Sequence, residues 1–531
     1  GQLIGGNARL LLLVEDEEIA HHTITVTQLS AEGSLWLGGL MYAHTGNAAE
    51  RDVLAPDTLT ALPEGTHEAG LVTDNPTRFY DPSVVADGNA ISRAIKKADL
   101  DSYLAGGVTF AATYQGRLVY KENMGRQNFL PETGDKAGCR QNTFESDSIM
   151  EMASVSKTVT AVLVMKLIND GVLNPTTGEP MSVHDPIKDY FPEAAFADTT
   201  IFDLMNHGAG FIPDNEKSGL TQAWPEFPYH LGFGAIEEYA GNVLAYPQRK
   251  EENFRVNMYN NDGYRVLLGL VSKMCGKDNA EEPLGAVQAY ADEVLFGPLG
   301  MDSTRFTGIL ASREPDLYNR LIIKNDYIPF DERYDRPESE YLFTSFFNTP
   351  SQGCDGLVSP VDDMINFSLL FLGDGEVDGV RIFKPEIMEF MVRPNDAEEY
   401  PGYANRTPVF WYGDDNFGSL EAHRLCIGHP GSSGSTLVID RVNQITSMQL
   451  SSSGHLEAPQ RQAAIDTLYA QIKLGAGNPD TPDPEPVPDD KPGSTSTGVG
   501  RSVWPWAALL SAGGGAAAAL VCRNRRNKAK R

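Results

Sequence analysis

Cysteine is scarce in this sequence of 531 residues, and the cysteines that occur are far apart. The five are Cys139, Cys275, Cys354, Cys426 and Cys522. No two of them form a C-x-x-C pair, which argues against a zinc site or a thioredoxin-type redox motif. Four of the five could pair as disulfides outside a cell. Buried thiols that behave as small apolar residues are the alternative, and the sequence leaves both open.

Several common catalytic motifs are also missing. The sequence contains no G-x-S-x-G, no H-E-x-x-H and no Walker loop, which disfavours α/β-hydrolases, zinc proteases of that type and P-loop NTPases. Positive charge is scarce as well, because 43 Lys and Arg face 72 Asp and Glu and give a formal net charge of −29. A surface this acidic repels phosphate backbones, so we do not expect nucleic acid as a partner.

The charge is unevenly spread, because the last thirty-one residues hold seven Lys or Arg and no acid. Residues 475–502 are rich in Pro and acids and predict an extended linker. Residues 503–522 are uncharged and about long enough to cross a bilayer, and the basic tail 523–531 follows at once. This order predicts a single-pass membrane anchor with a cytoplasmic tail and an extracytoplasmic body. A merely apolar tail is the alternative, and residues 475–502, before the span, contain no L-P-x-T-G motif of a cell-wall sorting signal.

Residues 1–90 form a region whose role the sequence does not reveal. They contain strand-like runs such as HTITVTQL and SLWLGGLMYA between Gly, Pro and Asn turns, but no catalytic pattern. An exported body needs a signal peptide, and the sequence opens with neither Met nor a basic start. We therefore expect the natural N-terminus to lie upstream.

Residues 91–474 have the alternation of elements typical of one α/β (α+β) domain. Two strands are expected around a Gln-Gly turn in 106–125, and a hairpin in 433–453. Between them, helical spacing runs from Lys157 to a closing Gly171 and recurs in later segments. Strands at both ends with helices between predict a sheet built from both ends of the domain and a helical insertion.

Ser154 and Lys157 form an S-x-x-K motif at the start of a predicted helix. Positions i and i+3 lie on one helix face, so the lysine amine can reach the serine hydroxyl. A helix N-terminus also favours negative charge developing on that serine. The motif alone is weak, because this composition yields about one such tetrapeptide by chance. An N-cap serine beside an exposed lysine is the simpler interpretation of these four residues.

Tyr259 and Asn261 lie in a second polar segment, NMYNNDGY, before another predicted helix. A phenol can act as a general base where a neighbouring cation stabilises its anion. An amide two residues on can bind a substrate carbonyl. Taken by itself, the segment also fits an ordinary polar turn.

His429, Gly431 and Ser432 lie in a third segment, IGHPGSSG, where we expect a strand to start. Glycine permits close approach of a ligand, and the backbone N–H of Ser432 can point at an oxyanion. An isolated histidine beside Gly and Pro is more often a turn residue. The three motifs in this order, 105 and 170 residues apart, are nevertheless not easily produced by chance.

Together the motifs resemble those of the serine β-lactamase and penicillin-binding D-Ala-D-Ala carboxypeptidase superfamily, in particular its class C and esterase-like branch. The pattern of that family is S-x-x-K, then Y-x-N, then K-T-G or H-x-G. The segments TTIFDLMNHGAGF, PLGMDSTRF and GCDGLVSPVDDMINF are similar to further signatures of the family. The resemblance implies an antiparallel sheet flanked by helices, with a helical insertion lobe.

The resemblance also implies a role for each matched residue. Ser154 would form the acyl-enzyme, and Lys157 and Tyr259 would share its deprotonation. Asn261 would orient the substrate amide or ester. The backbone N–H groups of Ser154 and Ser432 would form the oxyanion hole. No metal and no organic cofactor is implied.

His429 and Gly431 are expected at the substrate, but His429 departs from the lysine found in much of the family. A histidine of ordinary pKa, about 6.5, is mostly neutral at pH 7, so a fixed positive charge for a substrate carboxylate is weakened. We therefore expect carboxypeptidase, esterase or amidase chemistry ahead of β-lactam hydrolysis. His207, in the segment NHGAGF, belongs to a family signature, and we interpret it as structural.

The sequence thus predicts a membrane-anchored, extracytoplasmic serine hydrolase that acts through Ser154 on a peptide, amide or ester, with cell-wall peptide as a candidate substrate. One alternative is a non-catalytic module that binds cell-wall peptide or a partner on the same fold. Another is an adhesion or stalk protein, which explains the linker and anchor but leaves the three motifs as coincidence.

Overall fold

The structure is a computed structural model, which describes part of the 531-residue chain. The described residues are 6–14, 17–26, 34–37, 40–43, 84–98, 107–125, 145–212, 235–245, 249–278, 284–309, 313–321, 351–396, 398–403, 406–413, 426–451 and 464–472. The predicted linker, membrane span and basic tail lie outside these ranges, as do Cys139 and Cys522. Within the ranges, no helix combines the length and the apolar character needed to cross a bilayer. Cys275, Cys354 and Cys426 are buried thiols.

Two strand pairs form in the N-terminal region. Strand β1 (Gly6–Val14) pairs antiparallel with β2 (Glu17–Val26), and β3 (Ser34–Leu37) pairs antiparallel with β4 (Leu40–Ala43). The strand-like runs expected here therefore do form strands.

The main sheet is antiparallel, and its strand order is β13-β14-β15-β16-β5-β6. The strands are β5 (Gly107–Tyr114), β6 (Arg117–Gly125), β13 (Trp411–Tyr412), β14 (Ile427–Pro430), β15 (Thr436–Asp440) and β16 (Ile445–Ser451). Early and late segments meet where β16 pairs with β5, with Leu450 opposite Thr109. The predicted sheet built from both ends of the domain is thereby confirmed.

The hairpin between β5 and β6 turns at the expected Gln-Gly pair. Gln115 has φ 50° and Gly116 has φ 78°, so both central residues lie in the left-handed region. A two-residue turn of this kind matches the right-handed twist of the flanking strands.

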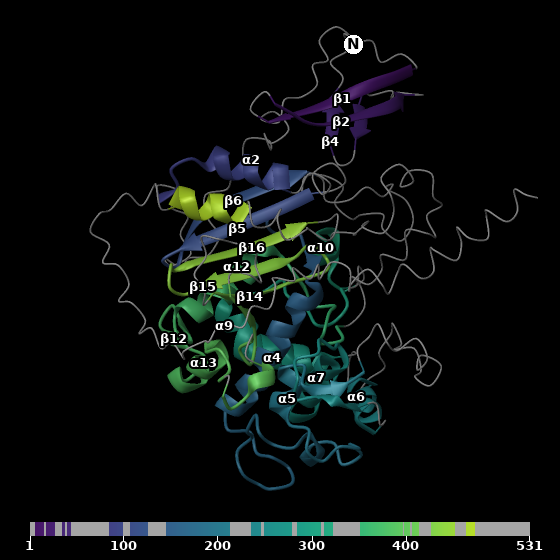
Figure 1. The fold of residues 1–531 in the computed structure, drawn as a ribbon, viewed down its shortest axis with the longest axis vertical. Coiled ribbons are helices and arrows are strands. Elements are labelled where there is room, and N and C mark those ends of the chain that lie inside the picture. The colour runs from purple at the N-terminus through teal and green to yellow at the C-terminus, as the bar shows by residue number, and fades with distance from the viewer. Residues whose placement is uncertain are drawn as a thin grey trace, which may run out of the picture.

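Helices cover both faces of the sheet (Figure 1). On one face lie α2 (Gly88–Ala98) and a helical segment at 464–472, which share an apolar cluster with alternate residues of β5, such as Val108 and Phe110. On the other face lies α12 (Val361–Leu372), whose apolar residues join the larger core with Ala111 and Leu450. Because each face of the sheet is covered, β5 carries apolar residues on both sides.

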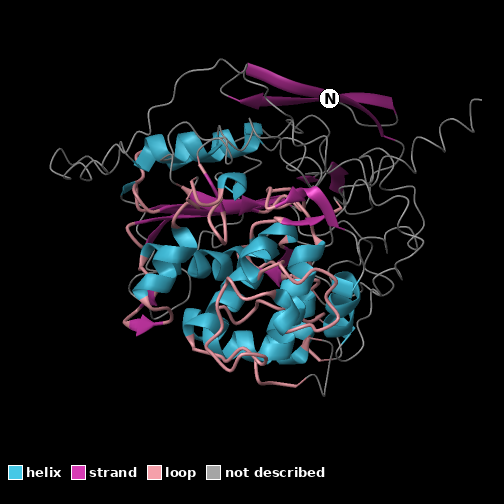
Figure 2. Cartoon of the chain, turned by 60° about the horizontal axis from the view of Figure 1, so that its bottom comes forward, coloured by secondary structure: helices cyan, strands magenta, loops and turns pink. Residues whose placement is uncertain are grey.

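A helical lobe lies beyond α12, and Figure 2 shows it as the largest group of helices. Its elements are the helices α4 (Ser156–Asn169), α5 (Ile201–Met205), α6 (Ala235–Ala245), α7 (Asp262–Met274), α8 (Gly285–Ala291), α9 (Gly297–Leu299), α10 (Pro315–Asn319) and α13 (Pro385–Val392), the π-helix Asp292–Phe296, the 3-10 helices η5 (Ala153–Val155), η6 (Ile187–Asp189) and η11 (Pro401–Tyr403), and the short strands β7 (Met150–Glu151), β8 (Ala209–Phe211), β9 (Arg249–Phe254), β10 (Val358–Ser359), β11 (Glu376–Val377) and β12 (Val380–Arg381).

Helix α4 is the centre of this lobe, because twelve of its fourteen residues are buried. A helix buried all round must satisfy its polar side chains internally. The hydroxyl of Thr158 accordingly donates to the carbonyl of Val155, and that of Thr160 to the carbonyl of Gly353. Gly171 has φ 72° just past the helix, as the sequence predicts for its end.

Candidate active site

Ser154 sits in the 3-10 turn η5, immediately before α4, and its side chain is partly exposed. It is not the N-cap, since that position is Val155. The preceding residue, Ala153, has φ 44°, a left-handed conformation that costs a non-glycine residue about 1 kcal/mol or more. The carboxylate of Glu151 holds this turn by accepting the N–H of Ala153 at 2.7 Å and that of Gly356 at 2.8 Å.

The side chains of Lys157 and Tyr259 converge on Ser154. Lys157 Nζ donates to Ser154 Oγ at 3.1 Å, and Tyr259 Oη lies 2.6 Å from the same oxygen. Lys157 Nζ also donates to the carbonyl of Cys354 at 2.8 Å and lies 4.8 Å from the centre of the Tyr259 ring. The first two motifs, 105 residues apart, therefore meet at one hydroxyl.

Lys157 is 1% exposed. Its charge state decides whether it can accept the proton of Ser154. Burial acts to lower the pKa of Lys157, but the neighbouring Tyr259, Cys354 and Asp355 outweigh it, and the pKa is raised above its ordinary value. Lys157 is therefore an ammonium at neutral pH and cannot accept a proton from Ser154. The other group in contact with the serine oxygen is Tyr259 Oη, which is therefore the candidate proton acceptor.

The loop that carries Tyr259, just before α7, is fixed by hydrogen bonds of the next residue, Asn260. Asn260, which is 3% exposed, accepts the N–H of Asp262 at 2.8 Å and donates to the carbonyl of Ile212 at 2.8 Å. Asn261 is partly exposed and lies directly before α7. Asn260 therefore fixes the conformation of this loop, whereas Asn261 remains accessible to a substrate. The motif alone did not show which of the two asparagines has which role.

His207 lies behind Tyr259, with 4.5 Å between the ring centres. Its Nδ1 lies 3.0 Å from the carbonyl oxygen of Asn260, and the Asn260 N–H approaches the same nitrogen at 3.2 Å. Burial lowers the pKa of His207 well below its ordinary value, and the nearby Arg406 and Lys157 lower it further. A neutral imidazole that supports the Tyr259 loop agrees with the structural role interpreted from the sequence.

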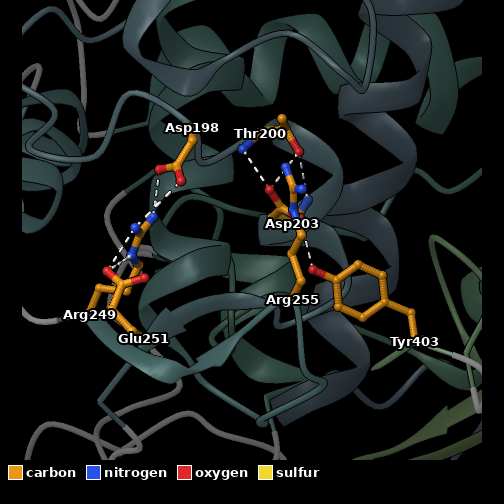
Figure 3. Close-up of polar contacts among 7 residues, drawn as sticks. All are labelled: Asp198, Thr200, Asp203, Arg249, Glu251, Arg255 and Tyr403. Carbon is orange, nitrogen blue, oxygen red and sulfur yellow. Dashed lines mark hydrogen bonds and ion pairs between the residues drawn. The ribbon is translucent and has the colours of Figure 1, made fainter. Parts of the chain in front are cut away.

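A polar network fixes the segment that carries His207 (Figure 3). At the start of α5, Thr200 and Asp203 form a reciprocal capping box. Asp203 also accepts from Tyr403 Oη at 2.8 Å and lies 3.6 Å from Arg255 Nε. Tyr403 in turn packs on Gly208, where an added Cβ would lie 1.8 Å from the tyrosine oxygen. These contacts hold the backbone in place where it leaves α5 toward His207.

The third motif lies at the end of strand β14, and the expectation that it starts a strand is wrong. His429 and Pro430 close β14, and the turn that follows leads into β15. Pro430 has no N–H to continue the ladder, which explains the stop. In the turn, Gly431 lies against the residues before Ser154, because an added Cβ would lie 2.6 Å from the carbonyl oxygen of Met152.

This turn is fixed to the nucleophile turn by hydrogen bonding as well as by packing. The hydroxyl of Ser435 donates to the Met152 carbonyl at 2.7 Å. Ser432, which is partly exposed, lies in this turn between Gly431 and Ser435. The structure therefore brings the third motif beside the first, which is the placement that the predicted oxyanion hole needs; the oxyanion hole itself stays a prediction.

His429 is buried, at 2% exposure, and its Nδ1 lies 2.6 Å from the carbonyl oxygen of Pro430. Burial lowers the pKa of His429 well below its ordinary value, and Lys157 and Arg406 act in the same direction. The neutral imidazole expected from the sequence is thereby reinforced. His429 therefore contributes a neutral, polar ring to the site and no positive charge.

Arg406 is a component of the site that sequence reasoning missed. Its side chain is fully buried, and its guanidinium carbon lies 5.2 Å from the centre of the Trp411 ring. Trp411 in turn lies 6.1 Å from the Tyr259 ring and 5.9 Å from the His429 ring. No local pattern marks Arg406, since a lone arginine ordinarily reads as a surface residue.

Comparison with protein-family models identifies the class of protein that this fold and site define. The model described as Beta-lactamase matches residues 93–471, well over half of the chain, so the chain belongs to the β-lactamase family within the serine β-lactamase and penicillin-binding protein superfamily. The match falls inside the predicted 91–474 domain, whose exact boundaries stay predictions.

Two curated relatives illustrate the range of the family. An "Uncharacterized protein" of Mycobacterium tuberculosis is 26% identical over 291 residues, which cover 51% of this chain and 65% of the relative, just under two thirds of its length. A "Putative D-alanyl-D-alanine carboxypeptidase" of Escherichia coli is 24% identical over 375 residues, which cover 61% of this chain and 78% of the relative.

Solved structures share the fold at low sequence identity. A penicillin-binding protein homologue from Caulobacter crescentus matches with TM-score 0.52 and 14% identity, over 72% of this chain and 97% of the other. A family VIII carboxylesterase matches with TM-score 0.53 and 16% identity, over 74% and 98%. Simvastatin synthase from Aspergillus terreus matches with TM-score 0.53 and 14% identity, over 74% and 100%. These likenesses establish the β-lactamase/transpeptidase-like fold.

Proposed function

We propose that the protein is a serine hydrolase that acts through an acyl-enzyme on Ser154. The observation that carries this proposal is the convergence of Tyr259 Oη and Lys157 Nζ on Ser154 Oγ, at 2.6 and 3.1 Å. A structural serine needs no such pair of partners, whereas a nucleophile needs a base within hydrogen-bond reach and a cation to stabilise that base. Membership of a superfamily of serine hydrolases supports the same conclusion.

In the proposed acylation, Ser154 Oγ attacks the substrate carbonyl and its proton passes to the phenolate of Tyr259. The negative charge that forms on the carbonyl oxygen is placed near the backbone N–H groups of Ser154 and Ser432. The bond from the carbonyl carbon to the leaving nitrogen or oxygen then breaks, and Tyr259 gives its proton to that atom. Throughout, Lys157 remains an ammonium that stabilises the anionic partner.

Deacylation repeats these steps with water. Tyr259 takes a proton from a water molecule that attacks the Ser154 ester, and the same proton returns to Ser154 Oγ as the ester bond breaks. Asn261, on the accessible side of the loop, orients the acyl group. The products are a carboxylic acid and the free serine.

The substrate class that we propose is a peptide, amide or ester, with cell-wall peptide first among the candidates. The name of the Escherichia coli relative supports a peptide, and the family VIII carboxylesterase supports esters. The predicted span at 503–522 and its basic tail support a catalytic domain anchored at the outer face of a membrane.

The test is covalent labelling of the full chain, read by intact mass and then by peptide mapping. A fluorophosphonate adduct on Ser154 supports the serine hydrolase. A penicillin adduct on the same serine points further to cell-wall peptides, whereas labelling by the fluorophosphonate alone favours an esterase or a peptidase of other specificity. No adduct from either reagent contradicts the proposal and favours a binding module on this fold.

A further inference from the structure

The loop 353–357, which leads into β10, is hydrogen-bonded to the segment that carries Ser154. Four buried side chains of that segment make these bonds. They are Glu151 to the N–H of Gly356 at 2.8 Å, Ser156 to the N–H of Leu357 at 3.2 Å, Lys157 to the carbonyl of Cys354 at 2.8 Å and Thr160 to the carbonyl of Gly353 at 2.9 Å. The position of the nucleophile segment therefore depends on a loop about two hundred residues further along the chain.

One oxygen of Glu151 binds both segments. Its Oε1 accepts the N–H of Ala153 at 2.7 Å and the N–H of Gly356 at 2.8 Å. A carboxylate oxygen has two lone pairs, so it can accept both hydrogen bonds at once. Two stretches of backbone that are distant in the sequence therefore meet at a single oxygen atom of a buried side chain.

Each of the two N–H groups belongs to a segment that positions one reacting group. Ala153 directly precedes Ser154, the nucleophile of the proposed reaction. Gly356 follows Cys354 by two residues, and the carbonyl of Cys354 accepts Lys157 Nζ at 2.8 Å. Helix α4 fixes the backbone of Lys157, but the amine lies at the end of a flexible four-carbon chain. The Cys354 carbonyl therefore helps to hold Lys157 Nζ at 3.1 Å from Ser154 Oγ.

The backbone ladder between β7 and β10 ends just before Ala153. In this ladder Glu151 lies opposite Val358. The N–H of Met152 extends the contact to the carbonyl of Leu357 at 2.8 Å. Ala153 lies past this point with φ 44°, a strained conformation that persists only where its surroundings fix it. The Glu151 carboxylate thus continues the connection between the two segments beyond the end of the ladder.

We propose that Glu151 is a positioning residue that sets the spacing between Ser154 Oγ and Lys157 Nζ. It does so by binding, at one oxygen, the turn of the serine and the loop that directs the lysine. This inference rests on the proposed function. Glu151 acts through the backbone of Ala153 and Gly356, and no step of the proposed acylation uses its carboxylate.

The experiment is a double-mutant cycle on the full chain, with the rate of Ser154 labelling by a fluorophosphonate as the readout. Glu151→Ala should slow labelling by about 10²-fold, which is the effect of roughly an ångström of displacement at a reacting site. In the Lys157→Ala background the same change should slow labelling by less than about threefold, because the spacing to a missing amine no longer matters. A purely structural role predicts the same factor in both backgrounds.

Glu151→Gln tests whether the shared acceptor is what matters. The carbonyl oxygen of glutamine can also accept two N–H groups. This variant should therefore keep the labelling rate within about tenfold of the wild-type rate, well above that of Glu151→Ala.

Asp363→Ala is the matched control. Asp363 is buried and also joins distant segments, because it accepts the N–H of Ser303 at 2.9 Å and the hydroxyl of Thr304 at 2.8 Å. Its loss should lower the melting temperature. The labelling rate per folded molecule should change by less than about threefold in either background.

Equal slowing by Glu151→Ala in both backgrounds overturns the inference, and so does a Glu151→Gln variant as slow as Glu151→Ala. A control that slows labelling as much as Glu151→Ala overturns it too. If Glu151→Ala does not fold, Glu151→Met takes its place with the same criteria. Failure of the proposed function is distinguishable, because the wild-type protein would then not be labelled at Ser154 at all.

Discussion

Two polar clusters of this protein, one around α5 and one around Tyr259, differ in how their charges are paired. Around α5, every charge in Figure 3 meets an opposite one: Asp203 lies beside Arg255, and Arg249 pairs with Asp198 and Glu251. Around Tyr259, by contrast, Lys157 and Arg406 form no ion pair within the described ranges.

The difference separates charge that stabilises the fold from charge that serves chemistry. A cluster whose members satisfy one another fixes the backbone that leaves α5 and needs no ligand. A cluster with an excess of charge of one sign destabilises the folded state. Local features that oppose folding in this way are expected at functional sites. The variants below test this contrast, beginning with the largest expected effect.

Ser154→Ala should remove turnover and leave the fold intact. Loss of the nucleophile in a hydrolase of this kind costs more than about 10⁴-fold in rate. Only one oxygen at a partly exposed position is deleted, so the free energy of unfolding should change by less than about 0.5 kcal/mol. Steady-state hydrolysis and thermal melting measure the two quantities. Hydrolysis that persists in this variant would place the chemistry elsewhere.

Gly431→Ala should slow acylation by about 10²-fold, because an ångström of displacement at a reacting site has an effect of that size. The added Cβ would lie 2.0 Å from Ser435 Oγ and 2.6 Å from the Met152 carbonyl oxygen, so the turn must move away from Ser154. Gly88→Ala, where the Cβ would meet only Tyr120 at 3.7 Å, is the control. Equal labelling rates for the two variants would remove Gly431 from the site.

Asp203→Ala tests the satisfied cluster and should act on stability. It removes the acceptor for the Thr200 N–H and for Tyr403 Oη and leaves these groups unpaired. We expect the free energy of unfolding to fall by about 3 kcal/mol, measured by denaturant titration. The labelling rate per folded molecule should fall far less than in the Gly431 variant. A larger loss of rate than of stability would tie the α5 cluster to the chemistry.

The smallest effect is expected in the acid range, at Asp198. The hydrogen bond from Arg249 holds the pKa of Asp198 below its ordinary value. A lowered pKa means that the contribution to stability is present above the ordinary range of an aspartate and is lost as the pH falls through the lowered value. Because the side chain is 55% exposed, the contribution should be under about 0.5 kcal/mol.

Asp198→Asn should therefore reduce slightly the loss of stability on acidification, as followed by thermal melting between neutral and acidic pH. An unchanged profile would mean that the Asp198–Arg249 pair contributes nothing to folding, and the contrast would then rest on Asp203 alone.

The sequence predicts much of this fold because its signals are local. The helix expected from Lys157 to Gly171 is observed as Ser156–Asn169 with Gly171 beyond its end, since a periodic apolar pattern and a closing glycine determine it. The antiparallel sheet built from both ends of the domain follows from strand patterns at each end. The convergence of Ser154, Lys157 and Tyr259 was predicted through motif spacing and family resemblance.

What the sequence did not predict depends on contacts between distant segments. The 3-10 turn that carries Ser154 is set by Glu151, which reaches Gly356 about two hundred residues on. The end of the strand at His429 is an exception, because Pro430, which has no N–H for the ladder, marks it within the local sequence. Arg406 is the clearest case, because its burial is a property of the assembled lobe and not of its neighbours in the chain.

The pairing of β16 with β5 has a consequence for how the protein is made. Leu450 and Thr109 are hydrogen-bonding neighbours across a separation of some 340 residues, so the loop that must close before the sheet is complete is almost as long as the domain. Domains with such distant contacts fold slowly. During synthesis β5 has one edge without its neighbour until residue 451 has emerged, and that edge is open to pairing with another chain. A chain ended before β16 should therefore aggregate, even though it would already contain Ser154, Lys157 and Tyr259.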